Sequence, residues 1–348
     1  MKKTILASAI AAASFSGAAM AAEHESNMPT VYGNIQYVVT HTNVDGAGST
    51  VAHDDNGSTL GVKHDHEIAP GLSGFFKLEL EGINADDKKD SSGIDGLDEA
   101  YVGVNSDSFG KVWIGSDDST YERAVVKIGN FHEVGSDIFS NDYETGEGDL
   151  LQYETPSFGG LTLGAAVQVN GDGEETTEQY IDKKGTATAA DDELAERTVK
   201  GDKSYPYQLA AHYSVENLKL SVAMDSNDSA EGDNNENSYG LAATYNMGDL
   251  TVIGEYQTRK DVSDIYGVMG VYTLGANQFA LSYQLQDDDV SGDKKDTVIL
   301  QALHNLSDNM YVYAEGYLSN GDADDTYELE DGSGDERQIA AVGAVYYF

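Results

Sequence analysis

The chain has 348 residues, with 61 Asp and Glu against 20 Lys and Arg, and a formal net charge of −41. So large a negative charge excludes nucleic acid as a partner, because phosphate binding requires clustered Lys and Arg. Cysteine is absent, which excludes disulfides and thiolate metal sites as supports of the fold.

The first 21 residues have the layout of a secretory signal peptide. Lys2 and Lys3 form a basic start, residues 5–18 are apolar or small, and Ala19-Met20-Ala21 is a small-x-small cleavage site. A membrane anchor would need a longer apolar run. We therefore expect a signal peptide over 1–21 and a single domain over 22–348.

Apolar and polar residues alternate along much of the remaining chain. In 278–286, Phe279, Leu281, Tyr283 and Leu285 take every second position, and 161–170 and 218–225 show the same pattern. A period of two indicates strands with one apolar and one polar face. No apolar run long enough for a membrane helix follows Ala21. The strands of a membrane barrel need apolar residues only at every second position, so a polar average does not exclude a membrane protein.

Short and long connectors alternate between the predicted strands. Seven short turns and eight longer, mostly acidic loops join sixteen strands, at 30–42, 58–68, 72–84, 97–105, 111–116, 149–156, 161–170, 204–215, 218–225, 237–247, 250–259, 264–274, 278–286, 296–306, 310–319 and 337–348. Short turns on one side and long loops on the other are typical of outer-membrane barrels. We predict an all-β fold, a transmembrane antiparallel barrel of sixteen strands that is wide enough for a water-filled channel.

The third long loop, Asp117 to Gly148, has an unusual content of apolar and aromatic side chains. It contains Tyr121, Val125, Val126, Ile128, Phe131, Val134, Ile138, Phe139 and Tyr143. A freely solvated loop gains nothing from these residues, so we expect it to pack inside the barrel. A loop folded over the rim as a lid is the alternative.

The last strand, Arg337 to Phe348, carries almost no charge and ends on an aromatic residue. Ala340, Val342, Ala344, Tyr346 and Phe348 share one face, because side chains alternate across a strand. Such a strand would be a sticky edge in water. We expect it to pair with the first strand and close the barrel, with this face toward lipid.

The ending resembles the C-terminal strand of the trimeric general porins of Gram-negative outer membranes. Val31-Tyr32-Gly33, Leu60-Gly61-Val62-Lys63 and Tyr101-Val102-Gly103-Val104 resemble segments of the same family in the same order. The resemblance implies an outer-membrane location, short periplasmic turns, long external loops and an infolded third loop. It also implies passive diffusion without catalysis or cofactor, a homotrimer, and assembly machinery that reads the C-terminal strand.

The family's third loop carries acidic residues at the pore constriction. Its Pro-Glu-Phe-Gly-Gly-Asp tip is not reproduced here, and Glu133 and Asp137 are our candidates for those carboxylates. The family places basic residues on the facing wall. The matching positions are Asn34, Thr59, Asp98 and Glu154, and none of them is basic.

Alternation assigns a further set of side chains to the lumen: Lys77, Glu79, Glu81, Glu255, Arg259, Tyr313 and Glu315. Tyr311 and Tyr317 share the face of Glu315, and each could line the pore or belong to an aromatic girdle at the membrane interface. A wall lined by carboxylates concentrates cations. We therefore predict a cation-preferring pore.

Other functions find less support in the sequence. A sugar-specific channel with a Tyr-lined path and a non-conducting adhesin or structural barrel are the alternatives. No catalytic motif of the hydrolase or metalloprotease type is present. His64 and His66 share a strand face but have no evident third ligand, so we predict no metal site. The acidic external loops could bind lipopolysaccharide through divalent cations.

Overall fold

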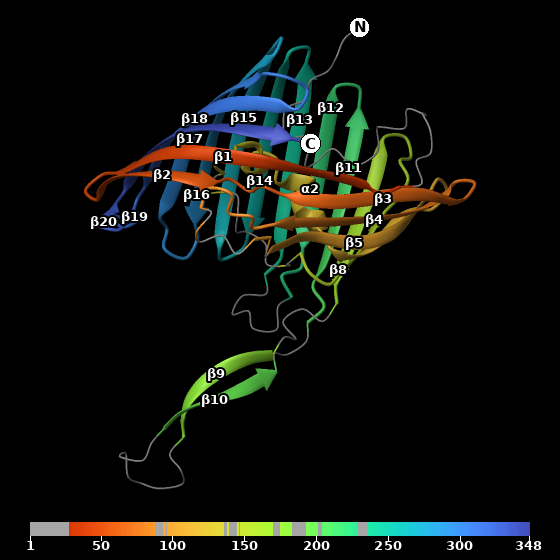
Figure 1. Cartoon of the computed structure of the whole chain (residues 1–348), viewed down its shortest axis with the longest axis horizontal. Coiled ribbons are helices and arrows are strands. Elements are labelled where there is room, and N and C mark those ends of the chain that lie inside the picture. The colour runs from red at the N-terminus through yellow and green to blue at the C-terminus, as the bar shows by residue number, and fades with distance from the viewer. Residues whose placement is uncertain are drawn as a thin grey trace.

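The computed structural model is a barrel of antiparallel strands that encloses a short helix (Figure 1). It describes residues 28–87, 89, 93–94, 96–135, 138, 145, 147–169, 175–182, 193–200, 204–228 and 236–348, with 175–182 and 193–200 described by their backbone only. The predicted signal peptide, 1–21, lies outside these ranges. In the described part of the chain, no helix is long and apolar enough to cross a membrane.

Sixteen strands form the barrel wall, as predicted. They are β1 (Thr30–Val44), β3 (Leu60–Ala69), β4 (Leu72–Glu81), β5 (Gly96–Ser106), β6 (Gly110–Ser116), β7 (Leu150–Glu154), β8 (Leu161–Gln168), β11 (Tyr207–Val215), β12 (Leu218–Asp225), β13 (Ser238–Met247), β14 (Leu250–Arg259), β15 (Ser263–Leu274), β16 (Asn277–Asp288), β17 (Lys294–Asn305), β18 (Met310–Gly321) and β21 (Glu336–Tyr347). Each pairs with its neighbours in this order.

The last strand closes the barrel on the first. β21 pairs with β1 from Asn34 opposite Tyr347 to Val44 opposite Arg337. Phe348 completes the seam, because its backbone N–H donates to the Gly33 carbonyl at 3.1 Å and its carbonyl accepts from the Gly33 N–H at 3.2 Å. Closure joins the first and last strands, so neither of them is left as a free edge in the bilayer.

The two faces of the wall differ as the alternation predicted. On β21, Val342, Tyr346 and Phe348 are exposed on the outside, whereas Ala341 and Val345 are buried on the inside. On β16, Phe279, Leu281 and Tyr283 are exposed in the same way. The outer face therefore carries the apolar residues that a membrane-spanning barrel presents to lipid.

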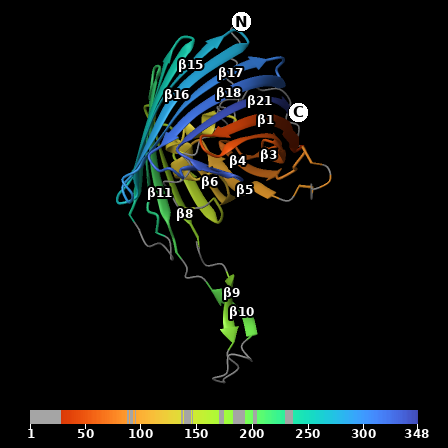
Figure 2. The same ribbon diagram turned by 90° about the vertical axis from the view of Figure 1, so that its left-hand side faces the viewer.

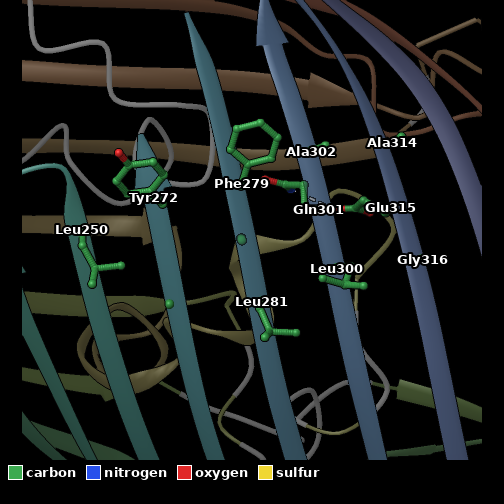
Figure 3. Close-up of a pocket in the computed structure, with 12 residues that line it drawn as sticks. Leu250, Tyr272, Phe279, Leu281, Leu300, Gln301, Ala302, Ala314, Glu315 and Gly316 are labelled. Carbon is green, nitrogen blue, oxygen red and sulfur yellow. Dashed lines mark hydrogen bonds between the residues drawn. The ribbon is translucent and has the colours of Figure 1, made fainter. Parts of the chain in front are cut away.

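A groove of about 540 Å³ lies on this outer face, over β14 to β18 (Figure 3). Tyr272, Phe279, Leu281 and Leu300 line it together with the small residues Gly270, Ala302, Ala314 and Gly316. Its exposed aromatic and leucine side chains belong to the membrane-facing surface.

Three external connectors contain strands that alternation did not predict. β2 (Gly48–Asp55) pairs with the outer half of β1 in a segment that we expected to be a loop. β9 (Glu175–Asp182) and β10 (Glu193–Lys200) form a hairpin that extends away from the barrel (Figure 2). β19 (Tyr327–Leu329) and β20 (Gly332–Gly334) form a small hairpin. β2 is polar along most of its length and largely exposed on both faces, so it lacks the signal that alternation provides.

Three aromatic rings on the inner face lie directly over glycines of the neighbouring strand. The opposed pairs are Tyr32 with Gly61, Phe75 with Gly103, and Tyr313 with Gly343. A Cβ at Gly343 would stand 2.3 Å from Cζ of Tyr313. The glycine therefore supplies the space in which the ring lies.

We expect Gly343→Ala to destabilise the barrel by about 1–3 kcal/mol, the usual cost of overpacking. Urea unfolding of the refolded protein in detergent measures this loss. Gly316→Ala is the matched control, because a Cβ at Gly316 meets nothing within 4 Å. If both variants unfold at the same urea concentration, packing of the Tyr313 ring does not require a glycine at position 343.

Candidate functional site: the constriction formed by the third loop

The third loop enters the barrel over residues 117–135 and follows its inner wall. It contains α2 (Thr120–Val125) and η1 (Gly129–Phe131), and the Ser119 side chain caps α2 by accepting from the Glu122 N–H. The apolar side of the loop packs on inward-facing wall residues in one buried cluster. Its members are Tyr121, Ala124, Val125, Val126, Ile128, Phe131, Ile138, Ala210, Ala223, Ala242, Ile253, Ile265, Met269, Val271 and Ala280. The apolar content of this loop thus serves packing inside the barrel.

Polar wall residues hold the first half of the loop. Gln208 of β11 accepts from the Tyr121 N–H at 3.0 Å, and the Tyr121 hydroxyl donates to Gln257 of β14 at 3.1 Å. The Glu255 carboxylate accepts from the N–H groups of Lys127 and Ile128, each at 2.9 Å. These bonds satisfy loop backbone donors that would otherwise be buried without partners.

A second carboxylate holds the middle of the loop. Glu315 of β18 accepts from the N–H groups of Glu133 and Val134, at 2.9 and 3.1 Å. It also accepts from the Tyr317 hydroxyl at 2.7 Å and the Gln301 amide at 2.8 Å. The loop therefore reaches from β6 across the wall to β18, and the open lumen lies on its other side.

This path corrects part of the predicted pore lining. Glu255, Arg259, Tyr313 and Glu315 do lie on the inner face, but each is at most 5% exposed. Glu255 and Glu315 bind loop backbone, and Tyr313 packs in a buried cluster with Val134 against it. Glu255, Tyr313 and Glu315 do not face open water in the lumen, because the loop lies over them.

The opposite wall, β3 to β7, carries inward-facing charges that remain partly exposed. Lys77 forms ion pairs with Glu79, at 3.2 Å, and with Glu99. Glu79, Asp98 and Glu99 have carboxylate oxygens within 4.8 Å of one another. A register shift beside Glu79 places Asp98 and Glu99 together there. Lys77 thus pairs with two of the three carboxylates, and Lys63 is directly opposite Lys77 in the β3–β4 register.

Basic and aromatic residues lie next to this group of carboxylates. The Lys111 ammonium lies 4.2 Å from the Trp113 ring centroid and 4.8 Å from that of Phe75. Arg123 of α2 packs over Trp113 and binds Asp117 at 2.7 Å. Neither basic residue was predicted. Alternation along β6 indicates the inward face of Lys111, whereas Arg123 lies in the helix of the third loop, which alternation does not describe.

A second carboxylate group lies at the base of the third loop. Asp118, Glu122 and Glu147 have oxygens within 4.8 Å of one another. Burial, and then the negative charge of Glu122 and Asp117, raises the pKa of Asp118 to about 6. Burial, and then the charges of Glu122 and Asp118, raises the pKa of Glu147 to about 7. Sequence spacing did not indicate this group, because Glu147 is far from Asp118 along the chain.

The other predicted site residues are placed as follows. Glu133 accepts from the Tyr311 hydroxyl at 3.0 Å, so it is held against the β18 wall. Glu154 is opposite Lys111 in the β6–β7 register. Glu81, at the end of β4, is exposed. Asp137 lies outside the described residues. Tyr311 and Tyr317 are buried inside the barrel and do not form an interfacial girdle.

One buried cluster has the residue types of a hydrolase triad. His132 Nε2 lies 2.9 Å from the Ser282 hydroxyl, and His132 Nδ1 lies 3.6 Å from Glu315. The His132 and Glu315 side chains are fully buried and Ser282 is 1% exposed, so a substrate cannot reach them. The cluster fastens the loop to the wall.

These features define an outer-membrane barrel with a loop-narrowed channel, and comparisons with known proteins agree. A sequence profile of the Gram-negative porin family matches residues 7–325. A Halomonas protein named "Monosaccharide porin" is 28% identical over the full length of both chains. Outer membrane porin protein 32 of Delftia acidovorans is 29% identical, covering 93% of this chain and 91% of its own.

Solved structures show the same fold. The anion-selective porin from Comamonas acidovorans superimposes with a TM-score of 0.68 at 21% identity, covering 92% of this chain and 99% of its own. The Salmonella typhi OmpF complex with daunomycin gives 0.67 at 14% identity, with 92% and 97% covered.

The chain belongs to the Gram-negative porin family. It is a channel of the outer membrane that allows passive diffusion, and it is not an enzyme.

Proposed function

We propose that the channel prefers small cations to anions. The observation that supports this is the charge on the two sides of the constriction. Glu79, Asp98 and Glu99 gather on the wall beside Lys77 and Lys63, and Asp118, Glu122 and Glu147 gather at the base of the third loop. Carboxylates of one sign in a low-dielectric passage raise the local concentration of cations and repel anions.

The zero-current potential of the purified protein in a planar bilayer under a KCl gradient tests this proposal. We expect a potential of the sign and size of a potassium-preferring pore. Clear channels with a potential near zero, or of anion sign, would refute the cation preference. Absence of conductance would favour the non-conducting adhesin.

The preference should weaken in acid. The pKa values of Asp118 and Glu147 are raised to about 6 and 7, so both carboxyls are mainly ionised at pH 8 and mainly neutral at pH 5. Carboxyls with ordinary pKa values near 4 stay ionised over this range. We expect the zero-current potential to fall between pH 8 and pH 5. An Asp118→Asn/Glu147→Gln variant should show a smaller step than the wild type, and an unchanged step would assign it to other groups.

Selective passage of monosaccharides is the second candidate. It is favoured by the name of the Halomonas relative and by the inward aromatic residues Tyr32, Phe75, Tyr101 and Trp113. Lysine ammonium groups lie over these rings, so a sugar would have to share their faces. Saturable block of the ion current by glucose would support this candidate.

We further propose that the mature protein begins after Ala21 and assembles as a homotrimer. The pattern of residues 1–21 supports the first proposal. The family resemblance supports the second, and exposed apolar side chains on the outer face supply area for contact between copies. We also propose that the acidic external loops contact lipopolysaccharide through divalent cations. Assembly machinery that reads the C-terminal strand would deliver the protein to the membrane.

A further inference from the structure

Four strands behind α2 present an unbroken row of the smallest residues on their inner face. Gly164 of β8 is directly opposite Ala210 of β11, Ala210 is opposite Ala223 of β12, and Ala223 is opposite Gly240 of β13. We call these four residues the small-residue row. The next residue in this register is Gln257 of β14, which is large.

The helix lies against this row without spare space. A Cβ at Gly240 would stand 2.5 Å from Cγ2 of Val125 and 3.0 Å from the Tyr121 hydroxyl. A Cβ at Gly164 would stand 3.3 Å from Cγ2 of Thr120. Tyr121, Ala124 and Val125 are fully buried between the helix and the wall. The contact is as tight as a protein core, so added volume must move one of its two sides.

The helix is the side that can move. The wall strands are fixed by hydrogen bonds to neighbours on both edges. The opposite side of α2 carries Glu122 and Arg123, which are partly exposed. A displacement away from the row therefore carries these two charged residues into the passage.

We propose that the small-residue row sets the width and the charge position of the channel, by fixing how far α2 stands from the wall. The row consists of positioning residues, which do not contact permeating solutes. The proposal rests on the channel function. It adds that this part of the wall determines the size of the solutes that can pass. Larger side chains in the row would narrow the passage, although none of them would line it.

The test is a graded pair of substitutions in planar bilayers. Gly240→Ala should lower the single-channel conductance by about 1.5-fold or more and lower the size limit for neutral polyethylene glycols, because its contact is the tighter one. Gly164→Ala, with a contact at 3.3 Å, should have a smaller effect in the same direction. Gly254→Ala on β14 is the matched control, because its Cβ meets nothing within 4 Å.

Rescue separates positioning from general damage to the barrel. Val125→Ala removes the methyl groups that a Cβ at Gly240 would meet, so the Gly240→Ala/Val125→Ala variant should regain the wild-type conductance and size limit. Unheated gel mobility reports whether each variant forms a folded barrel. Folded Gly240→Ala with wild-type conductance would overturn the proposal, as would an effect that Val125→Ala leaves unchanged. If Gly240→Ala fails to fold, Gly164→Ala must still show the narrowing. Absence of conductance in the wild-type protein would instead refute the channel function on which this proposal rests.

Discussion

Glu315→Ala should release the middle of the third loop from the wall. We expect it to cause a large loss of stability and a large change in single-channel conductance. The substitution leaves the partly buried N–H groups of Glu133 and Val134 without their acceptor. Each unsatisfied buried donor costs about 1–3 kcal/mol. We expect a lower urea midpoint, together with a higher and noisier single-channel conductance, because the loop no longer stays against the wall.

Two further variants make this prediction specific. Glu315→Gln keeps the shape of the side chain and one acceptor oxygen, so it should fall between wild type and Glu315→Ala. Glu67→Ala, at an exposed position of β3, should change neither stability nor conductance. A steady, wild-type conductance in Glu315→Ala would mean that Glu255 and the apolar contacts suffice to hold the loop.

Neutralising the wall carboxylates should give the largest change in selectivity. In an E79Q/D98N/E99Q variant, Lys77 keeps its charge while its two ion-pair partners lose theirs. The local charge then changes from negative to positive. We expect the potassium-to-chloride permeability ratio to fall by about threefold or more, since charges in a narrow passage are weakly screened.

A second triple variant removes the same amount of charge outside the lumen. Asp324, Asp325 and Asp331 are exposed on an external loop, and replacing them by Asn should change the ratio much less. Screening over about 10 Å at 0.1 M salt separates them from the path of the ions. Equal effects of the two triple variants would show that selectivity depends on total charge and not on this site.

The candidate site could be predicted only in part, for reasons that individual residues show. Alternation placed Glu79, Glu154 and Glu315 on the inner face, because the membrane requires the opposite face to be apolar. It could equally have found Lys111 and Trp113, which share a strand face opposite Val112 and Ile114. The grouping of Asp118 with Glu147 could not be found in this way, since it depends on where the two ends of a long loop meet.

The sequence by itself determined the class of fold, the closing strand and the face of the residues on regular strands, but not of Asp98 and Glu99 beside the register shift. These properties follow from local rules, because a strand between lipid and an interior must alternate, and an apolar terminal strand must be paired. The tertiary structure alone decided which inward residues meet water. Glu255, Glu315 and Tyr313 have the same strand pattern as Glu79, but the third loop covers them. The loop can lie there because its apolar side chains pack against the inner wall. The small residues that receive its helix come from four separate strands.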